Sequence, residues 1–459
     1  MEIQAERYAS VPPLSDKRSL LSDKPPPDFE SLRRVLLKRV GGGGHRLASL
    51  YTSILAFDDY MQRSSHSPRF DFFSDLLPHI HSWAFAYPSP APLKVPLLRA
   101  GSPSHALLSR GTIRTLLSNA FFLNVLPFRK AQACDHHVSA SMHGSRAHDV
   151  RASADHHAPT PEMAQFGDIS FMGLYTSSRE LAKERLLCLL AYFALALHFQ
   201  PQELEEEVCF ERHVLSESDT PNWTALNLRI NVNHIRVHTQ SMENTDGRCI
   251  MDFANKALHI HKIIPSATQE EVLFSACPEA FPGILFCDVL KDREVIVIRN
   301  VRRFVEYKGY GSTFKFEGLY PGVRFHDIIA ADATNTMHFT RPMNERDLNK
   351  AYLAFIAAAS TSSSSSFSAT KISTSHWGCG AFHGDKHHKF LQQVCASALA
   401  GVLLDYSTFG DAQTATSFKR LLGLIGSRCH TIGSVYRAMS GYRRERGEFF
   451  DYVYGNLSQ

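Results

Sequence analysis

The chain has 459 residues, of which 44% are hydrophobic, 20% charged and 11% aromatic, and this composition predicts a globular protein of two or three domains. Its formal net charge is +4, a balance that does not by itself identify a nucleic-acid-binding protein. The nine cysteines include no CxxC pair, which argues against a disulfide framework or a zinc ribbon and favours a reducing compartment.

The N-terminal part of the chain is predicted to be a leader followed by helices. Residues 1–27 are polar and contain several prolines, with no apolar signal-peptide segment, so we expect a flexible leader. Residues 28–210 are expected to form a helical accessory domain, because apolar residues recur there at helical spacing. The apolar stripes comprise Leu32, Val35, Leu36 and Val40, then Phe72, Leu76, Leu77, Ile80 and Trp83, and then Leu107, Ile113, Leu116, Leu117, Phe121 and Phe122.

A histidine-rich segment at residues 129–161 interrupts this helical pattern. It could be a metal-binding tract or a disordered surface insertion, and its composition favours the disordered insertion. The helical pattern resumes at residues 177–199. The apolar stretch Leu186–Phe199 is shorter than the roughly 20 residues that a bilayer-spanning helix needs. We therefore expect a buried helix in a soluble, intracellular protein.

From residue 211 onward, strand patterns alternate with helix patterns. Strands are expected at 226–237, 294–298 and 328–331, and helices at 345–358 and 421–441. The segment 387–404 predicts a helix followed by a buried strand, whereas the serine run 360–366 predicts a loop. This alternation is typical of an α/β sheet with helices on both faces.

The first segment that could carry chemistry is Thr268-Gln269-Glu270-Glu271. Thr268 and Glu271 have the spacing of a capping box, in which both side chains satisfy backbone N–H groups at a helix start. Capping alone would explain these residues. The functional interpretation is that one of the two adjacent carboxylates is a general acid and base for cleavage of a glycosidic bond.

The second such segment runs from Trp377 to Asp385 and contains three glycines just before a predicted helix. Glycines let backbone N–H groups approach a ligand closely, and a helix N-terminus attracts phosphate. Phe382 adds a flat apolar face for a sugar or a base. The alternative is a tight turn that needs glycine only for its backbone conformation.

Further short motifs accompany these two segments in a fixed order. The series is Met251-Asp252-Phe253-Ala254-Asn255-Lys256, Gln269-Glu270-Glu271, Tyr307-Lys308-Gly309-Tyr310, Leu348-Asn349-Lys350-Ala351-Tyr352, Trp377 to Asp385 and Ser407-Thr408-Phe409-Gly410-Asp411, with Ser118-Asn119-Ala120-Phe121-Phe122 in the helical part. From roughly residue 70 to the C-terminus, this order resembles the poly(ADP-ribose) glycohydrolase family. The resemblance implies a macrodomain-like mixed sheet flanked by helices at 211–459, preceded by the all-helical accessory domain.

The resemblance also implies an activity and its catalytic residues. The family hydrolyses the ribose–ribose O-glycosidic bonds of poly(ADP-ribose) and releases ADP-ribose. Glu271 matches the family's general acid and base, and Glu270 matches a residue that holds ribose hydroxyls. The chemistry needs a carboxylic acid that is still protonated near neutral pH, and we expect burial and the neighbouring carboxylate to raise the glutamate pKa.

Other positions match residues that bind the ADP-ribose unit. They are Asp252 and Asn255 beside the ribose, Gln269 on the adenine side, Tyr310 at the adenosine and phosphate portion, Gly380, Ala381 and Phe382 in a diphosphate loop, and Phe409 next to the adenine pocket. The resemblance implies no metal and no cofactor. It implies poly(ADP-ribose) and poly(ADP-ribosyl)ated proteins as partners, no direct nucleic-acid binding, no membrane, and residence in the nucleus or the cytoplasm.

The chain departs from the family in the loops expected to hold the diphosphate. His259-Ile260-His261 replaces a run of glycines, His376 replaces an asparagine, and His383 replaces a glycine. An isoleucine adopts a positive φ only at a cost, and its side chain would occupy space that a phosphate needs. Imidazoles or Lys262 could in turn donate to phosphate, or they could be ordinary surface residues. The alternative function is therefore an ADP-ribose-binding module with impaired catalysis.

Overall fold

The computed structural model describes residues 8–10, 24–39, 47–64, 69–85, 94–124, 167–244, 246–360 and 369–459. The predicted histidine-rich insertion at 129–161 and most of the leader 1–27 lie outside these residues, as does all of the serine run except Ser360. Within the leader, Tyr8–Ser10 forms β1, which pairs antiparallel with β2 (Lys94–Pro96).

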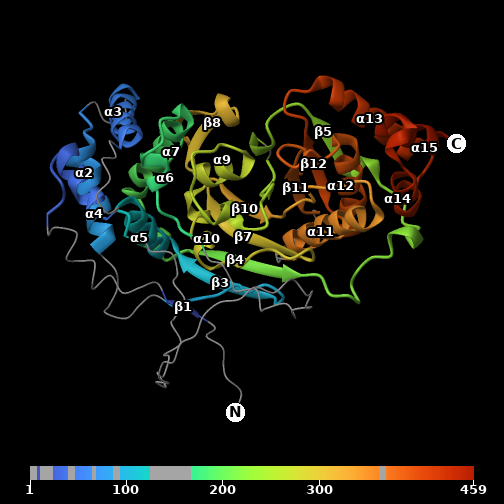
Figure 1. Ribbon diagram of the computed structural model, residues 1–459, viewed down its shortest axis with the longest axis horizontal. Helices are drawn as coiled ribbons and strands as arrows, with labels where there is room; N and C mark the ends of the chain where they lie inside the picture. The colour runs from blue at the N-terminus through green and yellow to red at the C-terminus, as the bar shows by residue number, and fades with distance from the viewer. Residues whose placement is uncertain are drawn as a thin grey trace, which may run out of the picture.

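Helices dominate the first half of the chain, at the left of Figure 1. They are α2 (Phe29–Leu37), α3 (Ala48–Arg63), a π-helical turn at Phe72–Leu76 that continues into α4 (Leu77–Phe85), α5 (Arg110–Phe121), α6 (Met172–Tyr175), α7 (Glu180–Ala196) and α8 (Pro201–Glu205). All apolar residues of α7 between Leu186 and Phe193 are buried. This confirms the predicted buried helix, and no helix within the described ranges has the length and apolar character to cross a membrane.

One predicted helix begins later than expected, because its first residues form a strand. β3 (Ser104–Ser109) pairs antiparallel with β4 (Glu207–Val214), and α5 begins only at Arg110, where the Ser109 side chain accepts from Thr112 N. Leu107 therefore belongs to a strand and is 47% exposed, while Ala106 and Leu108 on either side of it are buried. The helical half thus contributes the edge strand of the main sheet.

The main sheet has eight strands in the order β3-β4-β7-β10-β6-β11-β12-β5. β3, β4, β7 (Glu294–Arg302) and β10 (Phe325–Ala330) are mutually antiparallel neighbours. From β10 onward the neighbours are parallel: β6 (Cys249–Asp252), β11 (Lys371–Thr374), β12 (Leu403–Ser407) and β5 (Ile235–His238). The sheet is therefore mixed, and the carboxyl ends of five strands meet at one edge.

Helices cover this sheet in the second half of the chain. They are α9 (Gln269–Ala276), α10 (Gly283–Phe286), α11 (Arg341–Ala359), α12 (Lys386–Ala400), α13 (Ala412–Ser427), α14 (Ile432–Ser440) and α15 (Phe449–Ser458). α11 packs on β4, β7 and β10 and lies beside α12. A two-stranded hairpin of β8 (Val305–Lys308) and β9 (Lys315–Leu319) stands apart from the sheet. The expected strands at 294–298 and 328–331 and the expected helices are confirmed.

The strand expected at 226–237 is wrong over most of its length. Only Ile235–His238 forms a strand. The backbone before it pairs with the start of α14 instead, because Ile432 N donates to Leu228 O and Gly433 N donates to Leu226 O. This segment therefore pairs with the start of a helix rather than with a strand of the sheet, and Leu228 is 49% exposed.

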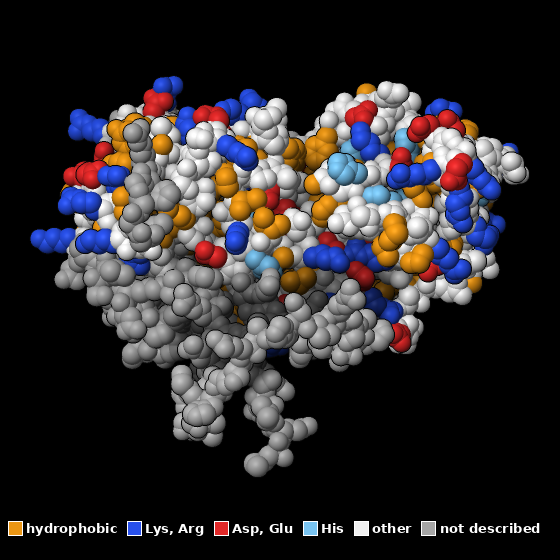
Figure 2. Space-filling model, viewed as in Figure 1, with side chains coloured by type: hydrophobic (Ala, Val, Ile, Leu, Met, Phe, Trp, Pro, Cys, Tyr) orange, Lys and Arg blue, Asp and Glu red, His pale blue; other side chains and the backbone are white. Residues whose placement is uncertain are grey.

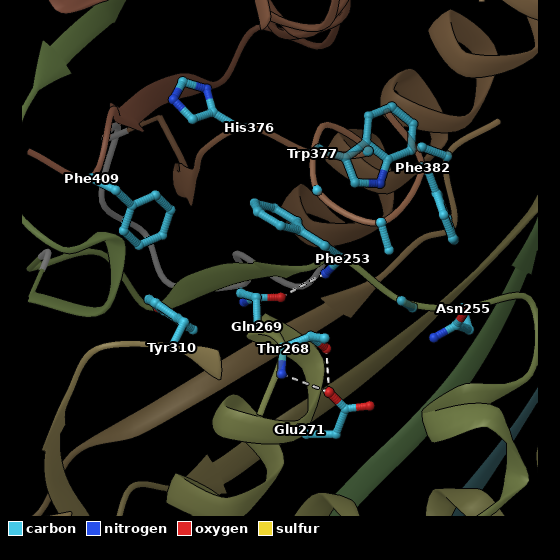
Figure 3. Close-up of a pocket in the computed structure, with 15 residues that line it drawn as sticks. Phe253, Asn255, Thr268, Gln269, Glu271, Tyr310, His376, Trp377, Phe382 and Phe409 are labelled. Carbon is cyan, nitrogen blue, oxygen red and sulfur yellow. Dashed lines mark hydrogen bonds between the residues drawn. The ribbon is translucent and has the colours of Figure 1, made fainter. Parts of the chain in front are cut away.

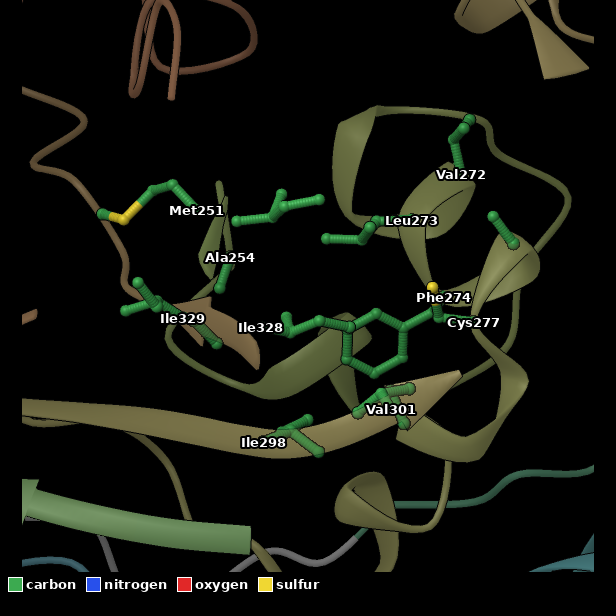
Figure 4. Packing of buried hydrophobic residues seen from close by; sticks show 14 of the residues in the cluster. Met251, Ala254, Val272, Leu273, Phe274, Cys277, Ile298, Val301, Ile328 and Ile329 are labelled. Carbon is green, nitrogen blue, oxygen red and sulfur yellow. The ribbon is translucent and has the colours of Figure 1, made fainter. Parts of the chain in front are cut away.

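The helix that carries the two candidate glutamates is anchored by the core of the sheet. Figure 4 shows Phe274 of α9 above β7, beside Ile328 of β10 and Val301 of β7. All three side chains are fully buried. Burying an aromatic ring of this kind contributes roughly 1.5–3 kcal/mol, and the anchor holds the first turn of α9 against the carboxyl end of β6.

Candidate functional site

A cavity of about 340 Å³ opens where the parallel strands end. Its walls are the segments that follow β6, β10, β11 and β12, together with the first turn of α9 and Tyr310. Open α/β sheets bind ligands at this edge because the loops after neighbouring strands converge there. The lining residues are Phe253, Ala254, Asn255, Thr268, Gln269, Glu271, Tyr310, Ala333, His376, Trp377, Gly378, Gly380, Ala381, Phe382 and Phe409.

The cavity brings together most of the predicted site residues. Those that line it are Asn255, Gln269, Glu271, Tyr310, Gly380, Ala381, Phe382 and Phe409. In Figure 3, Tyr310 and Phe409 lie at one end, Asn255 and Phe382 at the other, and Glu271 below the middle. The Glu271 carboxyl therefore shares one cavity with the aromatic rings at both ends.

Two predicted site residues, Asp252 and Glu270, lie behind the cavity wall. Both are buried, with 0% and 1% exposure. Glu270 accepts from His259 N at 2.6 Å and from Asn255 Nδ2 at 3.1 Å. Glu270 thus holds the loop that follows β6 rather than presenting a carboxyl to the cavity.

The Glu271 carboxylate is held by the cap of its own helix. Its Oε2 accepts from Thr268 N at 2.8 Å, from the Thr268 hydroxyl, and from Ser266 Oγ at 3.3 Å. The predicted capping box is therefore present. Because Glu271 also lines the cavity, the capping and the functional interpretations apply to the same carboxylate.

The pKa shifts of the two glutamates are the reverse of what the chemistry was expected to need. Burial raises the pKa of Glu270 to about 8, although the hydrogen bond from His259 N opposes this. Burial acts in the same direction on Glu271, but its pKa is nevertheless lowered by His259, the Thr268 hydrogen bonds and the Arg185 guanidinium. Burial also lowers the pKa of His259 to about 4, so that ring is neutral near pH 7. At that pH the Thr268 hydrogen bonds and the Arg185 guanidinium are the contacts that favour the ionised form of Glu271.

Asp252 resembles Glu270 in its environment. Burial, followed by the nearby Glu270 and Glu271, raises the pKa of Asp252 well above its usual range. Neither carboxyl oxygen of Asp252 has a hydrogen-bond partner among the described residues. Two buried carboxyls behind the cavity therefore favour the protonated form.

The substituted loop after β6 keeps a left-handed backbone without glycine. His259, Ile260 and His261 have φ values of 54°, 49° and 57°, so the loop keeps this conformation although an isoleucine adopts it only at a cost. The His259 ring explains why, because it is fully buried 5.5 Å from both the Phe274 and the Phe281 ring centroids. Ile260 is 41% exposed. None of residues 256–267 lines the cavity, so the isoleucine does not fill it.

A buried arginine from the helical half ties this loop to α9. Arg185 of α7 donates to Ile264 O at 2.6 Å, to Ser266 O at 3.0 Å and to Ser275 Oγ at 2.8 Å. Its guanidinium also lies 3.3 Å from Nε2 of His259. His259 donates through Nδ1 to Lys262 O at 2.8 Å, which leaves Nε2 as the acceptor for Arg185. No sequence pattern pointed to Arg185.

The second predicted ligand loop, from Trp377 to Phe382, forms another wall of the cavity. Gly378 has a φ of 75°, and a Cβ atom there would lie 2.5 Å from Cβ of Ala333, so this position requires glycine. The start of α12 is not free for phosphate as expected, because the Asp385 side chain accepts from His388 N at 2.8 Å. A ligand would instead meet the backbone of residues 378–382. His383 and Lys262 do not line the cavity.

The aromatic end of the cavity is built from two distant segments. The Tyr310 and Phe409 rings lie 5.2 Å apart, edge to face, and the Tyr310 hydroxyl donates to Glu243. Gln269, the predicted adenine-side residue, accepts from Phe253 N at 2.8 Å and donates to Met251 O at 3.1 Å. Its amide therefore fixes the start of α9 to the end of β6.

Several lining residues were not predicted as site residues. They are Phe253, Ala254, Thr268, Ala333, His376, Trp377 and Gly378. Most of them lie inside the motifs already singled out, so their position next to predicted residues was the available signal. Ala333 follows β10 and carried no such signal. Among the lining residues Glu271 is the one acidic residue and none is Lys or Arg.

A metal site was one alternative for the histidines of the chain. Within the described ranges, no group of three or more His, Cys, Asp or Glu side chains is placed to hold a metal ion. The histidine-rich segment that prompted the alternative lies outside those ranges.

Two family models match the chain in the order of its two halves. Residues 65–212 match the helical domain of poly(ADP-ribose) glycohydrolase, and residues 220–416 match its macro domain fold. The expected arrangement of a helical domain before a macrodomain-like sheet is thereby confirmed. The boundary expected at residue 210 falls inside β4 and stays a prediction.

Individual relatives agree with these matches. Poly(ADP-ribose) glycohydrolase 1 of Caenorhabditis elegans is 28% identical over 315 residues, which cover 63% of this chain and 39% of the relative. Poly(ADP-ribose) glycohydrolase 2 of the same organism is 30% identical over 219 residues, which cover 43% of this chain and 44% of the relative. The chain therefore matches less than half the length of these two curated relatives.

Solved structures that are similar to this chain include further poly(ADP-ribose) glycohydrolases. One is a mutant poly(ADP-ribose) glycohydrolase from Deinococcus radiodurans in complex with ADP-ribose. It is 17% identical, with a TM-score of 0.28, and the match covers 41% of this chain and 83% of that chain.

Proposed function

Because the chain belongs to the poly(ADP-ribose) glycohydrolase family, we propose that it hydrolyses the ribose–ribose O-glycosidic bonds of poly(ADP-ribose), free or attached to proteins, and releases ADP-ribose. The observation that carries this proposal is the position of Glu271. Its carboxyl faces a cavity that has aromatic rings at both ends and a glycine-bearing loop along one wall. An elongated ligand with a base, a diphosphate and a terminal ribose suits this order of groups.

Glu271 would act as the general acid and base. It protonates the leaving ribose oxygen, its carboxylate then faces the positive charge of an oxocarbenium-like transition state, and it finally takes a proton from the attacking water. The Glu271 carboxyl is ionised near neutral pH, because its pKa is lowered. Bound substrate would raise the pKa of Glu271 and so favour its protonated form. A diphosphate brings negative charge close to the carboxyl and displaces water, and both effects raise a carboxyl pKa.

The binding roles follow from the walls of the cavity. Tyr310 and Phe409 would receive the adenine, and backbone N–H groups of residues 378–382 would receive the diphosphate, since the lining offers no Lys or Arg. Asn255 lies at the Phe382 end, where the terminal ribose would sit. Glu270 would contribute by holding Asn255 and the backbone of His259 in place.

The first experiment measures ADP-ribose released from purified poly(ADP-ribose). Glu271→Gln keeps a side chain that can still cap α9 but removes the proton donor. We expect its rate to fall by about 10²–10⁴-fold, the usual contribution of general acid–base catalysis. Glu217→Gln is the matched control, because Glu217 is 96% exposed. Absence of release by the unmodified protein at high concentration would contradict the proposed activity.

The second candidate function is ADP-ribose binding with impaired catalysis. Two observations favour it: the low pKa of Glu271 and the replacement of the loop glycines by His259, Ile260 and His261. It predicts heat of ADP-ribose binding in calorimetry without release of ADP-ribose from the polymer. Turnover that is lost in Glu271→Gln would decide against it.

A further inference from the structure

A second cavity, of about 590 Å³, lies next to the Phe382 loop. It is enclosed by the segment between β10 and α11 and by the segment between α14 and α15. Its lining residues are Met337, His338, Phe339, Thr340, Arg341, Tyr442, Arg443, Arg444 and Glu445. The volume is within the range of cavities that hold small ligands, about 300–1,000 Å³.

A hydrogen bond links the walls of the two cavities. His338 lines the second cavity, and its Nε2 donates to the carbonyl oxygen of Phe382 at 2.9 Å. Phe382 in turn lines the cavity of Glu271 and lies at the end opposite Phe409 (Figure 3). The second cavity is therefore a neighbour of the Phe382 end of the first.

The second cavity contains a buried polar atom that has no partner. His338 is 5% exposed, and its Nδ1 has no hydrogen-bond partner among the described residues. Burial and then the charge of Lys389 lower the pKa of His338, so the ring is neutral. Because Nε2 carries the proton that is donated to Phe382, Nδ1 is left as a buried acceptor. The structure thus fixes the His338 ring between the second cavity and Phe382.

The second cavity also supplies the positive charge that the first lacks. Three of its lining residues are arginines and one, Glu445, is acidic. Arg341 pairs with Glu345 at 2.8 Å. Arg443 donates to the backbone carbonyls of Ser440 and Tyr442, and Arg444 lies 5.7 Å from the Phe339 ring centroid. Neither has a carboxylate partner within the part of the chain that is described, so both guanidinium groups are available to an anion.

The start of α11 adds to this preference for anions. Arg341 is the first residue of this 19-residue helix, and its N-cap, Thr340, makes no side-chain capping hydrogen bond. The partial positive charge of a helix N-terminus therefore faces the same cavity as the arginines. Figure 2 shows further Lys and Arg side chains over the C-terminal helices at the right-hand end of this face.

We propose that the second cavity binds the diphosphate of the next ADP-ribose unit in the polymer. Arg443 and Arg444 would bind the phosphates. This inference rests on the proposed function, because it assumes that an ADP-ribose unit occupies the Glu271 cavity. It assigns the binding of the neighbouring unit to these two arginines.

The test compares ligands of different length by calorimetry at fixed ionic strength. All proteins carry Glu271→Gln, so that the polymer is not cut. The subsite variant adds Arg443→Gln and Arg444→Gln, and the matched control adds Lys419→Gln and Arg428→Gln, two exposed cations of α13 and its C-terminus that line neither cavity. The ligands are ADP-ribose, a linear oligomer of several ADP-ribose units, and single-stranded DNA of equal charge.

We expect the subsite variant to bind the oligomer about tenfold more weakly, as the loss of charge-assisted contacts to phosphate predicts, and to bind ADP-ribose as before. The control should bind both ligands normally. Unchanged oligomer affinity in the subsite variant, an equal loss for ADP-ribose, or an equal loss for DNA would each overturn the subsite while ADP-ribose binding still supports the proposed function. If the chain bound neither ADP-ribose nor oligomer, the proposed function would fail and the subsite with it.

Discussion

Glu271 performs two tasks with one carboxylate, because it caps α9 and faces the cavity. The Thr268 hydroxyl and backbone N–H both donate to it, and these hydrogen bonds favour the ionised form. The cap therefore opposes the protonation that the proposed acid catalysis needs. The strength of the cap therefore contributes to the pH at which Glu271 takes up a proton.

A change at Thr268 tests this link at the scale of a single residue. Thr268→Val removes the hydroxyl donor and should raise the pKa of Glu271, since a hydrogen bond to the charged carboxylate favours the ionised form. A reaction that needs protonated Glu271 loses kcat/KM as the pH rises through this pKa. The falling limb of the pH profile should therefore move to higher pH in Thr268→Val.

Thr431→Val is the matched control for this experiment. Thr431 caps α14 with the same box geometry and lies outside the cavity. Both substitutions should destabilise the fold by about 1 kcal/mol, the usual cost of losing an N-cap. A shift of the pH profile in both variants, or in neither, would contradict a specific role of Thr268.

The loop after β6 shows, at the scale of an element, how a segment keeps its path after losing its glycines. Three successive left-handed residues cost roughly 1–2 kcal/mol each when they are not glycine. The burial of the His259 ring and its contacts with Arg185 and Lys262 offset this cost at the first position. Ile260, which is 41% exposed, has no such compensation.

Ile260→Gly should therefore stabilise the protein, by about 1 kcal/mol, because glycine adopts a φ of 49° without strain. Urea unfolding measures the change. Release of ADP-ribose should stay the same, since Ile260 does not line the cavity. Val323→Gly is the control: Val323 is 60% exposed and has no left-handed backbone, so glycine should only lower the stability there. Destabilisation by both substitutions would show that residue 260 is not strained.

At the scale of the whole molecule, the helical half is part of the site rather than a separate unit. Arg185 of α7 holds the loop and the helix that carry the candidate glutamates. Glu184 accepts from Phe316 N at 2.9 Å, and the Tyr60 hydroxyl accepts from Leu319 N at 2.9 Å. β3 extends the main sheet from the helical side.

These contacts predict that both halves unfold in one cooperative transition. Trp83 of α4 reports on the helical half and Trp377 on the other. Each of two variants keeps one of these tryptophans and has Phe at the other tryptophan positions, and in each the urea midpoint by fluorescence should coincide with the midpoint by far-ultraviolet circular dichroism. An earlier midpoint for Trp83 would mean that the helical half melts separately and that Arg185 does not couple the halves.

Local patterns and the order of motifs along the chain predicted several features that the structure contains. The capping box at Thr268 and Glu271, the helices α11 and α12, and the grouping of Gly380 to Phe382 with Tyr310 and Phe409 are all found in the structure. Each depends on spacing along one element or on motif order. Leu107 and Leu228 were misassigned because backbone pairing with distant segments outweighed the local pattern. Leu107 belongs to β3, which pairs with β4. Leu228 lies in a segment whose carbonyl groups accept from the start of α14.

The sequence alone determined the family, the order of the helical and macrodomain-like parts, and which motif holds the candidate acid, because these follow from residues close together in the chain. Only the tertiary structure decided that Glu271 is ionised, that Glu270 faces inward, and that an arginine-lined cavity adjoins Phe382. The reason is electrostatic and geometric: the pKa of a carboxyl depends on burial and on charges such as Arg185 that approach through space. A cavity, likewise, exists only where separate segments meet.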